Sequence, residues 1–133
     1  MSAANIEITQ ALFAAFGAGD VPGILAHVND DIRIEFYGPS DIIPYADFYE
    51  GMDEARRFFE TVLASVDIHV FDTQEFLSDG DKVVVTGVLH LTAKSTGRDI
   101  KSDFVHVITM KDGKWSKFRD FMDTHEAVKA FGK

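Results

Sequence analysis

Two alternating runs of apolar and polar residues, at 99–111 and 114–123, predict a long β-hairpin. Asp112-Gly113 lies between them, and this dipeptide favours a two-residue type I′ turn because both central residues need a positive φ. If these two residues form the turn, Lys111 pairs with Lys114 and every later pair follows from that register.

This register predicts an inner face that is mostly apolar. It places His106 opposite Arg119, Phe104 opposite Phe121, Ser102 opposite Asp123, and Ile108 opposite Lys117. The other face would carry the mixed side chains of a partly covered surface, namely Asp103, Val105, Val107, Thr109, Phe118, Asp120 and Met122. A histidine and an arginine that oppose each other on an apolar face indicate a pocket.

Two further turns, at 78–81 and 96–97, predict that the hairpin belongs to a four-stranded antiparallel meander. Gly87 has no side chain, and its expected place beside His106 would leave space in front of the imidazole. The turns set the pairs Val70 with Leu89, Ile68 with Leu91, Leu89 with Phe104, Leu91 with Ser102, and Gly87 with His106.

Periodicity also predicts the elements around the meander. Gly17 is a candidate for the left-handed position after the first helix, and Gly38-Pro39 ends the first strand. The predicted elements are helices at 6–16, 21–28 and 52–65, a strand at 31–37, an irregular apolar segment at 40–51, and a short helix that opens with a capping box at 123–126 and ends at Phe131.

Composition limits the function classes. The length of 133 residues predicts one domain, 1–133, and the absence of cysteine excludes disulfides, thiolate metal sites and a cysteine nucleophile. A net charge of −9 argues against nucleic acid and anionic membranes as partners. The chain has no signal-like N-terminus and no long apolar run, so we expect a cytoplasmic protein with no membrane partner. Twelve phenylalanines can line a cavity or fill a core, and composition does not distinguish these.

His106 and Arg119 are the first candidate site residues, and each has two interpretations. His106 is either a hydrogen-bonded core histidine or an acid, base or ligand-orienting group. A buried Arg119 needs a carboxylate or an anionic or carbonyl ligand. Asp123 is the nearest carboxylate on the same strand but lies about 13 Å away along an extended chain, and it is also a candidate helix cap.

Tyr45 is either a loop aromatic or a phenol that donates to a ligand oxygen. On the outer face, His69 and His90 are predicted to oppose each other, with Asp103 opposite His90. A metal site there is conceivable, but strand pairing often brings such residues together by chance. We therefore predict no metal ligands.

The order of the elements resembles the NTF2-like cone, and five segments resemble its SnoaL-like, ketosteroid-isomerase-related branch. They are ALFAAFGAGD, IPYADFYEGMDEARRFF, FLSDGDKVVVTG, TGRDIKSDFVHVITMKDGK and KFRDFMDT. The resemblance implies an α+β cone in which a curved antiparallel sheet wraps around N-terminal helices with an apolar pocket, and a homodimer that forms through the outer sheet face. It also implies that Asp123 matches the acid or base of SnoaL-like cyclases, and that Arg119 with Asp123 matches part of the limonene-epoxide hydrolase site.

These observations lead to one functional hypothesis and two alternatives. The hypothesis is a cofactor-independent isomerase, cyclase or epoxide hydrolase that acts on an apolar carbonyl or epoxide compound. The alternatives are a non-catalytic protein that binds a hydrophobic ligand and a structural dimer with a filled cavity. The candidate catalytic residues are Asp123, His106, Arg119 and Tyr45, and the candidate pocket residues are Phe104, Phe121, Ile108, Leu89, Leu91, Ser102, Phe48 and Phe59.

Overall fold

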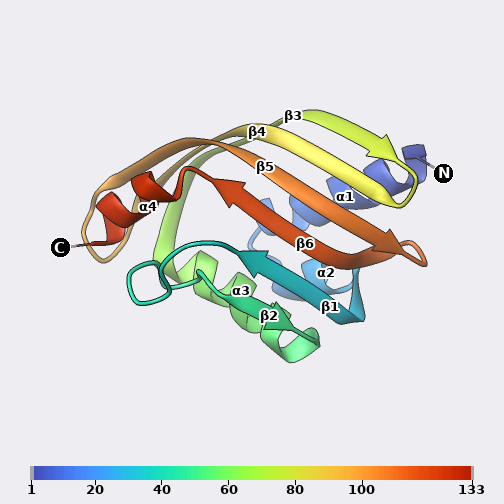
Figure 1. Ribbon diagram of the computed structural model, residues 1–133, viewed down its shortest axis with the longest axis horizontal. Coiled ribbons are helices and arrows are strands. Elements are labelled where there is room, and N and C mark those ends of the chain that lie inside the picture. Colours follow the sequence, from blue (N-terminus) through green and yellow to red (C-terminus); the bar gives the residue numbers. More distant parts are fainter. Residues whose placement is uncertain (1, 133) are drawn as a thin grey trace.

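The computed structural model describes residues 2–132, so Met1 and Lys133 of the predicted domain lie outside the described residues. The chain forms a mixed α+β fold of helices and one curved sheet (Figure 1). The elements are α1 (Ser2–Gly17), α2 (Val21–Leu25), β1 (Val28–Phe36), β2 (Phe48–Glu50), α3 (Met52–Ser65), β3 (Val66–Asp79), β4 (Lys82–Ala93), β5 (Asp99–Lys111), β6 (Lys114–Met122) and α4 (Thr124–Phe131).

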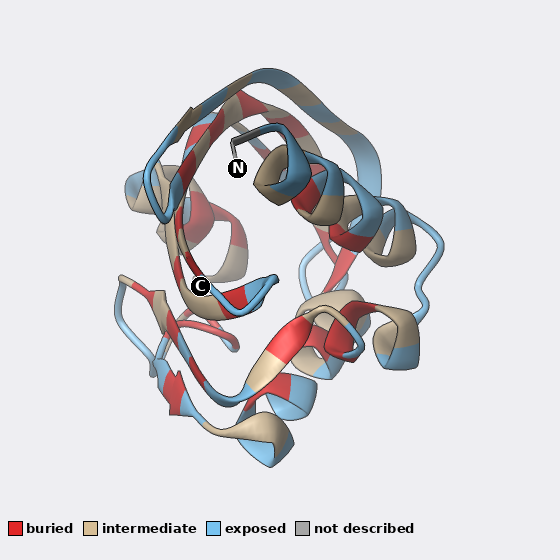
Figure 2. Ribbon diagram, turned by 90° about the vertical axis from the view of Figure 1, so that its right-hand side faces the viewer, coloured by how far each residue is buried: buried red, intermediate tan, exposed pale blue. Residues whose placement is uncertain are grey.

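The sheet has six strands in the order β2-β1-β6-β5-β4-β3. All neighbours are antiparallel except β1 and β6, which are parallel. The strands curve around α1, α2 and α3 (Figure 1), and along β4 and β5 buried residues alternate with more exposed ones (Figure 2). Residues of the sheet and of the helices line one pocket between them. The concave face of the sheet therefore forms the wall of the core.

The N-terminal helices bury their apolar faces against this wall. In α3, the predicted bounds are confirmed, and Ala55, Phe58 and Phe59 are its buried residues. In α1, Leu12 and Thr9 are buried, and the Thr9 hydroxyl accepts a hydrogen bond from Trp115 Nε1 on β6 at 3.2 Å. This bond fixes α1 against the sheet.

The predicted Asp112-Gly113 turn is confirmed, but the register beyond it is wrong. Both turn residues have positive φ, and Lys111 pairs with Lys114. A β-bulge follows, because Met110 pairs with Trp115 whereas Thr109 pairs with Lys117. The extra residue, Ser116, exchanges the two faces of β6.

The bulge changes the partner of His106. His106 pairs with Asp120 and not with Arg119, and Phe104 pairs with Met122. Phe118, Asp120 and Met122 therefore lie on the concave face, where we had expected Arg119 and Phe121.

The predicted register between β4 and β5 is wrong by two residues, because the loop spans 94–97. The Ala93 amide donates to the Arg98 carbonyl, and Gly97 adopts a left-handed φ of 77°. A two-residue shift keeps the faces but changes the partners. The observed pairs are Val85 with His106, Gly87 with Phe104, Leu89 with Ser102, and Leu91 with Ile100.

Two other expectations need correction. Gly87 leaves no space in front of His106, since a Cβ at Gly87 would lie 2.7 Å from Cζ of Phe104. Between β3 and β4, Ile68 pairs with Leu91 as predicted, but Leu89 pairs with Phe71 instead of Val70 because of a bulge after Ile68. Among the described residues, no helix is long and apolar enough to cross a membrane.

Candidate active site

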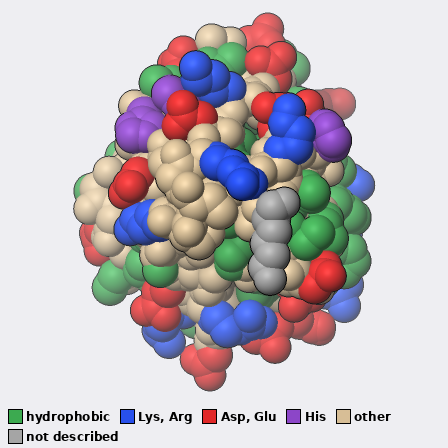
Figure 3. Space-filling view, turned by 90° about the vertical axis from the view of Figure 1, so that its left-hand side faces the viewer, with side chains coloured by type: hydrophobic (Ala, Val, Ile, Leu, Met, Phe, Trp, Pro, Cys, Tyr) green, Lys and Arg blue, Asp and Glu red, His purple; other side chains and the backbone are tan. Residues whose placement is uncertain are grey.

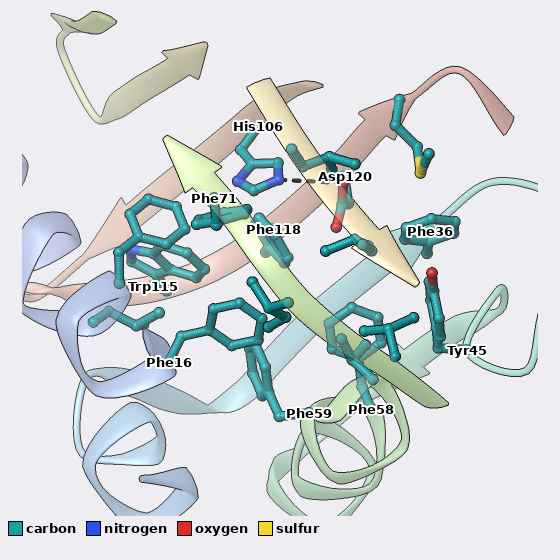
Figure 4. Close-up of a pocket in the computed structure, with 18 residues that line it drawn as sticks. Phe16, Phe36, Tyr45, Phe58, Phe59, Phe71, His106, Trp115, Phe118 and Asp120 are labelled. Atoms are coloured by element: carbon teal, nitrogen blue, oxygen red, sulfur yellow. Dashed lines mark ion pairs between the residues drawn. The ribbon is translucent and has the colours of Figure 1, made fainter. Parts of the chain in front are cut away.

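A pocket lies between the helices and the concave face of the sheet (Figure 4). Its free volume is about 60 Å³, enough for a few water molecules, so a larger ligand requires side chains to move. Three polar residues, Tyr45, His106 and Asp120, project into an otherwise apolar lining. Much of that lining is aromatic and includes Phe13, Phe16, Phe36, Phe58, Phe59 and Phe118.

His106 and Asp120 form a buried pair. His106 Nε2 lies 3.2 Å from Asp120 Oδ1, and their side chains are 4% and 16% exposed. A carboxylate can only accept a hydrogen bond, so this short distance favours the tautomer that has its proton on Nε2. The β6 bulge is the cause of this arrangement, because it turns Asp120 inward.

The other imidazole nitrogen is unpaired within the described residues. His106 Nδ1 is buried and has no hydrogen-bond partner there. Phe104 and Phe118 lie against the ring, with centroids 4.6 and 4.8 Å away. Figure 4 shows Nδ1 pointing away from Asp120. A neutral His106 therefore offers a lone pair at Nδ1, while Asp120 fixes the ring orientation.

Tyr45 comes from the loop between β1 and β2. It is 2% exposed, and its ring packs edge-on against Phe36 at 5.0 Å and Phe131 at 5.8 Å. Burial, and secondarily the negative charge of Asp120, raise the pKa of Tyr45. The phenol therefore stays protonated and can donate a hydrogen bond within the pocket.

We expect this raised pKa to weaken the fold at alkaline pH. Unfolded Tyr45 ionises near its ordinary pKa of 10.0, whereas the folded chain keeps the proton, so stability falls as pH rises above about 10. In Tyr45→Phe, the fall in unfolding free energy above that pH should be shallower by up to about 1.4 kcal/mol per pH unit. Urea unfolding of both proteins between pH 9 and 11 measures this difference, and equal slopes would contradict it.

Arg119 lies on the outer face, where its carboxylate partner comes from a neighbouring strand. Its Nε is 3.7 Å from Glu35 Oε1 on β1, and its guanidinium lies 4.9 Å from the ring centroid of Phe121. The side chain is 40% exposed. The expectation that Arg119 shares a face with His106 is therefore wrong, because the bulge reverses its direction.

Asp123 caps α4 and is exposed. Its Oδ1 accepts from the His125 amide at 3.1 Å, and its own amide donates to Ser102 Oγ at 3.0 Å. It follows the last residue of β6, so it does not extend the inner face. Of the two interpretations of Asp123, the observed contact with the His125 amide is therefore that of a helix cap.

The predicted pocket residues divide into three groups. Leu89, Leu91 and Phe59 line the pocket. Phe104 and Ile108 are buried in the core, and Ser102 lies near Asp123. Phe121 and Phe48 lie outside the pocket, where Tyr37 packs against both rings at 5.3 Å.

Asp120 is the site residue that we had assigned to the wrong face. The sequence contains a signal for the bulge, because Trp115 and Phe118 are both large and apolar but three positions apart. An uninterrupted strand would put them on opposite faces, yet both are buried.

Among the described residues, a group of three side chains that could hold a metal ion lies outside this pocket, at His69, His90 and Asp99.

The fold is that of an NTF2-like protein, in which a curved sheet wraps around N-terminal helices and an apolar pocket lies between them. The SnoaL-like domain family matches residues 9–118, and the chain belongs to this family. Solved structures with the same fold include proteins described as a putative SnoaL-like polyketide cyclase, a putative isomerase and an LEH-like epoxide hydrolase, at 17–18% identity. No curated protein matches the chain.

Solved structures support the same assignment. An NTF2-like protein from Burkholderia xenovorans LB400 is 29% identical, with a TM-score of 0.91 over 99% of this chain and 98% of that one. An NTF2-like protein of unknown function from Burkholderia pseudomallei K96243 is 28% identical, with a TM-score of 0.89 over both complete chains. TerC, co-crystallised with polyporic acid, is 29% identical, with a TM-score of 0.80 over 95% of this chain and 98% of its own.

Proposed function

We propose that the chain is a cofactor-independent enzyme that transfers a proton on an apolar carbonyl, enol or epoxide compound. The observation that carries this proposal is the close approach of the His106 imidazole and the Asp120 carboxylate inside an apolar pocket. A buried pair of acid and base costs desolvation energy, and a pocket of phenylalanines gives no structural need for it.

Each polar group has a distinct role in this proposal. The His106–Asp120 pair accepts the substrate proton and returns it, either at Nδ1 or at the carboxylate oxygen not bound to His106. Tyr45 donates a hydrogen bond to the oxygen that gains negative charge. The aromatic walls exclude water, which strengthens both interactions. Isomerisation, ring closure and epoxide opening can all use these roles.

The family assignment and one solved structure support a small hydrophobic ligand. The chain is a SnoaL-like domain, and structures of the same fold are described as a putative polyketide cyclase, a putative isomerase and an epoxide hydrolase. TerC, which shares 29% identity over nearly the whole chain, was co-crystallised with polyporic acid. The second candidate is a non-catalytic binding protein, which the small and largely apolar pocket also favours.

Compound screening separates the two candidates. Wild type and Asp120→Asn are tested against apolar ketones, enols and epoxides by thermal shift, and every compound that stabilises wild type is then analysed for product by mass spectrometry. The proposal expects product with wild type and much less with Asp120→Asn. Stabilisation of both proteins without product would support the binding protein, and no stabilisation by any compound would contradict both candidates.

We also propose that two copies of the chain pair through the outer sheet face. Val105 is 37% exposed on β5, a central strand of the sheet, and Val84, Val88 and Val107 are half-buried around it. An apolar patch at the centre of a sheet favours a self-complementary interface.

Val105→Lys should weaken this dimer at least about tenfold, because it puts a like charge from each copy into the interface. Light scattering across a concentration series measures the effect. Ala64→Lys, exposed on α3, is the control and should leave the dimer unchanged. A monomeric wild type, or equal dissociation constants for all three proteins, would contradict the proposed interface.

A further inference from the structure

Three potential metal ligands meet on the outer face, at the end of the sheet near the β4–β5 loop. His69 on β3, His90 on β4 and Asp99 on β5 each offer a ligand atom, and these atoms all lie within 4.8 Å of one another. Histidine and acidic side chains lie next to each other on this side of the molecule (Figure 3). The cluster lies on the opposite side of the sheet from the pocket, so it is independent of the proposed function.

The spacing of these atoms suits a small tetrahedral cation. His90 Nε2 lies 3.5 Å from Asp99 Oδ2. Zinc–ligand bonds of 2.0–2.1 Å put neighbouring ligand atoms roughly 3.3 Å apart in a tetrahedral site. The ring centroids of His69 and His90 are 4.9 Å apart, and a ligand atom of each ring lies within 4.8 Å of the other and of the Asp99 carboxylate, which is close enough for the three to share one ion.

A β-bulge puts His69 in this position. Ile68 pairs with Leu91 and Val70 pairs with His90, so His69 is the extra residue of the bulge and projects outward beside His90. Bulges often re-aim a side chain at a functional position. We had expected Asp103 opposite His90, but the two-residue shift between β4 and β5 puts Lys101 there and brings Asp99 to the cluster.

Hydrogen bonds already orient the ligands. Thr92 Oγ1 lies 2.7 Å from His69 Nε2 and donates to Asp99 Oδ1 at 2.9 Å. The Thr92 bond occupies Oδ1 of Asp99, so Oδ2, which faces His90, is the oxygen available as a ligand. Metal ligands characteristically have such partners.

One ligand nitrogen lacks a partner. His90 Nε2 is buried, and it forms no hydrogen bond with any described residue. A buried ring nitrogen without a hydrogen bond is costly, and a cation shared with the Asp99 carboxylate at 3.5 Å would satisfy it. Lys101 is the register partner of His90, and Asp67 forms an ion pair with Lys94 at 3.9 Å, so the strands that carry the cluster hold charges of both signs.

We propose that His69, His90 and Asp99 bind Zn²⁺, with a fourth position open to solvent. Two imidazoles and one carboxylate form a donor set typical of zinc. The ion would link three strands across a bulge, so its role is to fix the end of the sheet.

Zinc titration of the full chain, with any affinity tag removed, tests the site. Calorimetry with ZnCl₂ is expected to show one equivalent bound, and His69→Gln and Asp99→Asn should each weaken binding by more than about 100-fold, since loss of a direct ligand exceeds the effect of its supporting partners. Thr92→Val should weaken it by about 10- to 100-fold. His125→Gln is the matched control, because His125 is exposed and lies outside the cluster.

Two further measurements show whether the bound ion is four-coordinate and whether the variants are folded. The Co²⁺ complex of wild type should show the visible absorption of a four-coordinate site, and this absorption should disappear in His69→Gln. Circular dichroism of the zinc-free variants establishes that they are folded. Failure of wild type to bind zinc, or equal affinity in folded wild type, His69→Gln and Asp99→Asn, would overturn the proposal.

Discussion

His106→Gln and Asp120→Asn are each expected to lower turnover by a factor on the order of 10² to 10⁴ for any substrate found by the screen. Each variant removes one half of the His106–Asp120 pair, the only contact between an imidazole and a carboxylate among the described residues that line the pocket. The double variant should lose little more than either single variant, because the two groups act as one unit. Steady-state kinetics at matched substrate concentrations measures the losses.

Asp123→Asn and Arg119→Gln are the controls for this prediction. Asparagine caps a helix about as well as aspartate, and Arg119 contacts Glu35 and Phe121 on the outer face, so both variants should keep wild-type turnover. Thermal unfolding of all four variants separates lost chemistry from lost structure. A large loss in Asp123→Asn with full activity in Asp120→Asn would contradict the proposed site.

Gly87→Ala is expected to destabilise the fold by about 3 kcal/mol, which lowers the melting temperature by roughly 10 °C. An added Cβ would collide with the Asp72 carbonyl oxygen and lie 2.7 and 2.9 Å from ring atoms of Phe104. The first neighbour is backbone, and Phe104 is only 1% exposed, so neither can move easily.

Gly17→Ala is the matched control for this effect. Gly17 is the last residue of α1, its φ is not left-handed, and a Cβ there would meet nothing within 4 Å. Alanine has the higher helix propensity, so stability should stay equal or rise by up to about 1 kcal/mol. Urea unfolding of the three proteins gives the comparison. Equal stability of Gly87→Ala and wild type would mean that Phe104 does not pack over Gly87.

Patterns within a single element were sufficient to predict most of the fold. Residues 52–65 were predicted as a helix from their apolar spacing and form α3 with these bounds. The Asp112-Gly113 turn follows from local chemistry, and Asp112 is the only described residue other than glycine with a positive φ. The residue that ends the first helix was harder to predict. Gly17 was the candidate for the left-handed position after Phe16, but Gly19 is the glycine that adopts it.

Strand registers were harder to predict. A register error of one residue exchanges the side chains that face the core with those that face outward, whereas an error of two residues does not. The two-residue error between β4 and β5 kept Leu89 and Leu91 in the pocket wall. The one-residue bulge at Ser116 moved Arg119 outward and Asp120 inward, which replaced one candidate site with another. A bulge depends on how Trp115 and Phe118 both pack into the core, and this requires knowledge of α1 and α3.

Nuclear magnetic resonance of the His106 ring tests the central claim, that the bulge brings His106 and Asp120 together in the pocket. We expect a proton on Nε2 that exchanges slowly with water, and nuclear Overhauser contacts from the ring to Phe104 and Phe118. Substitution of Asp120 by alanine should speed that exchange. Contacts from the ring to the side chains of Arg119 and Phe121, or an Nε2 proton unaffected by Asp120→Ala, would contradict the account.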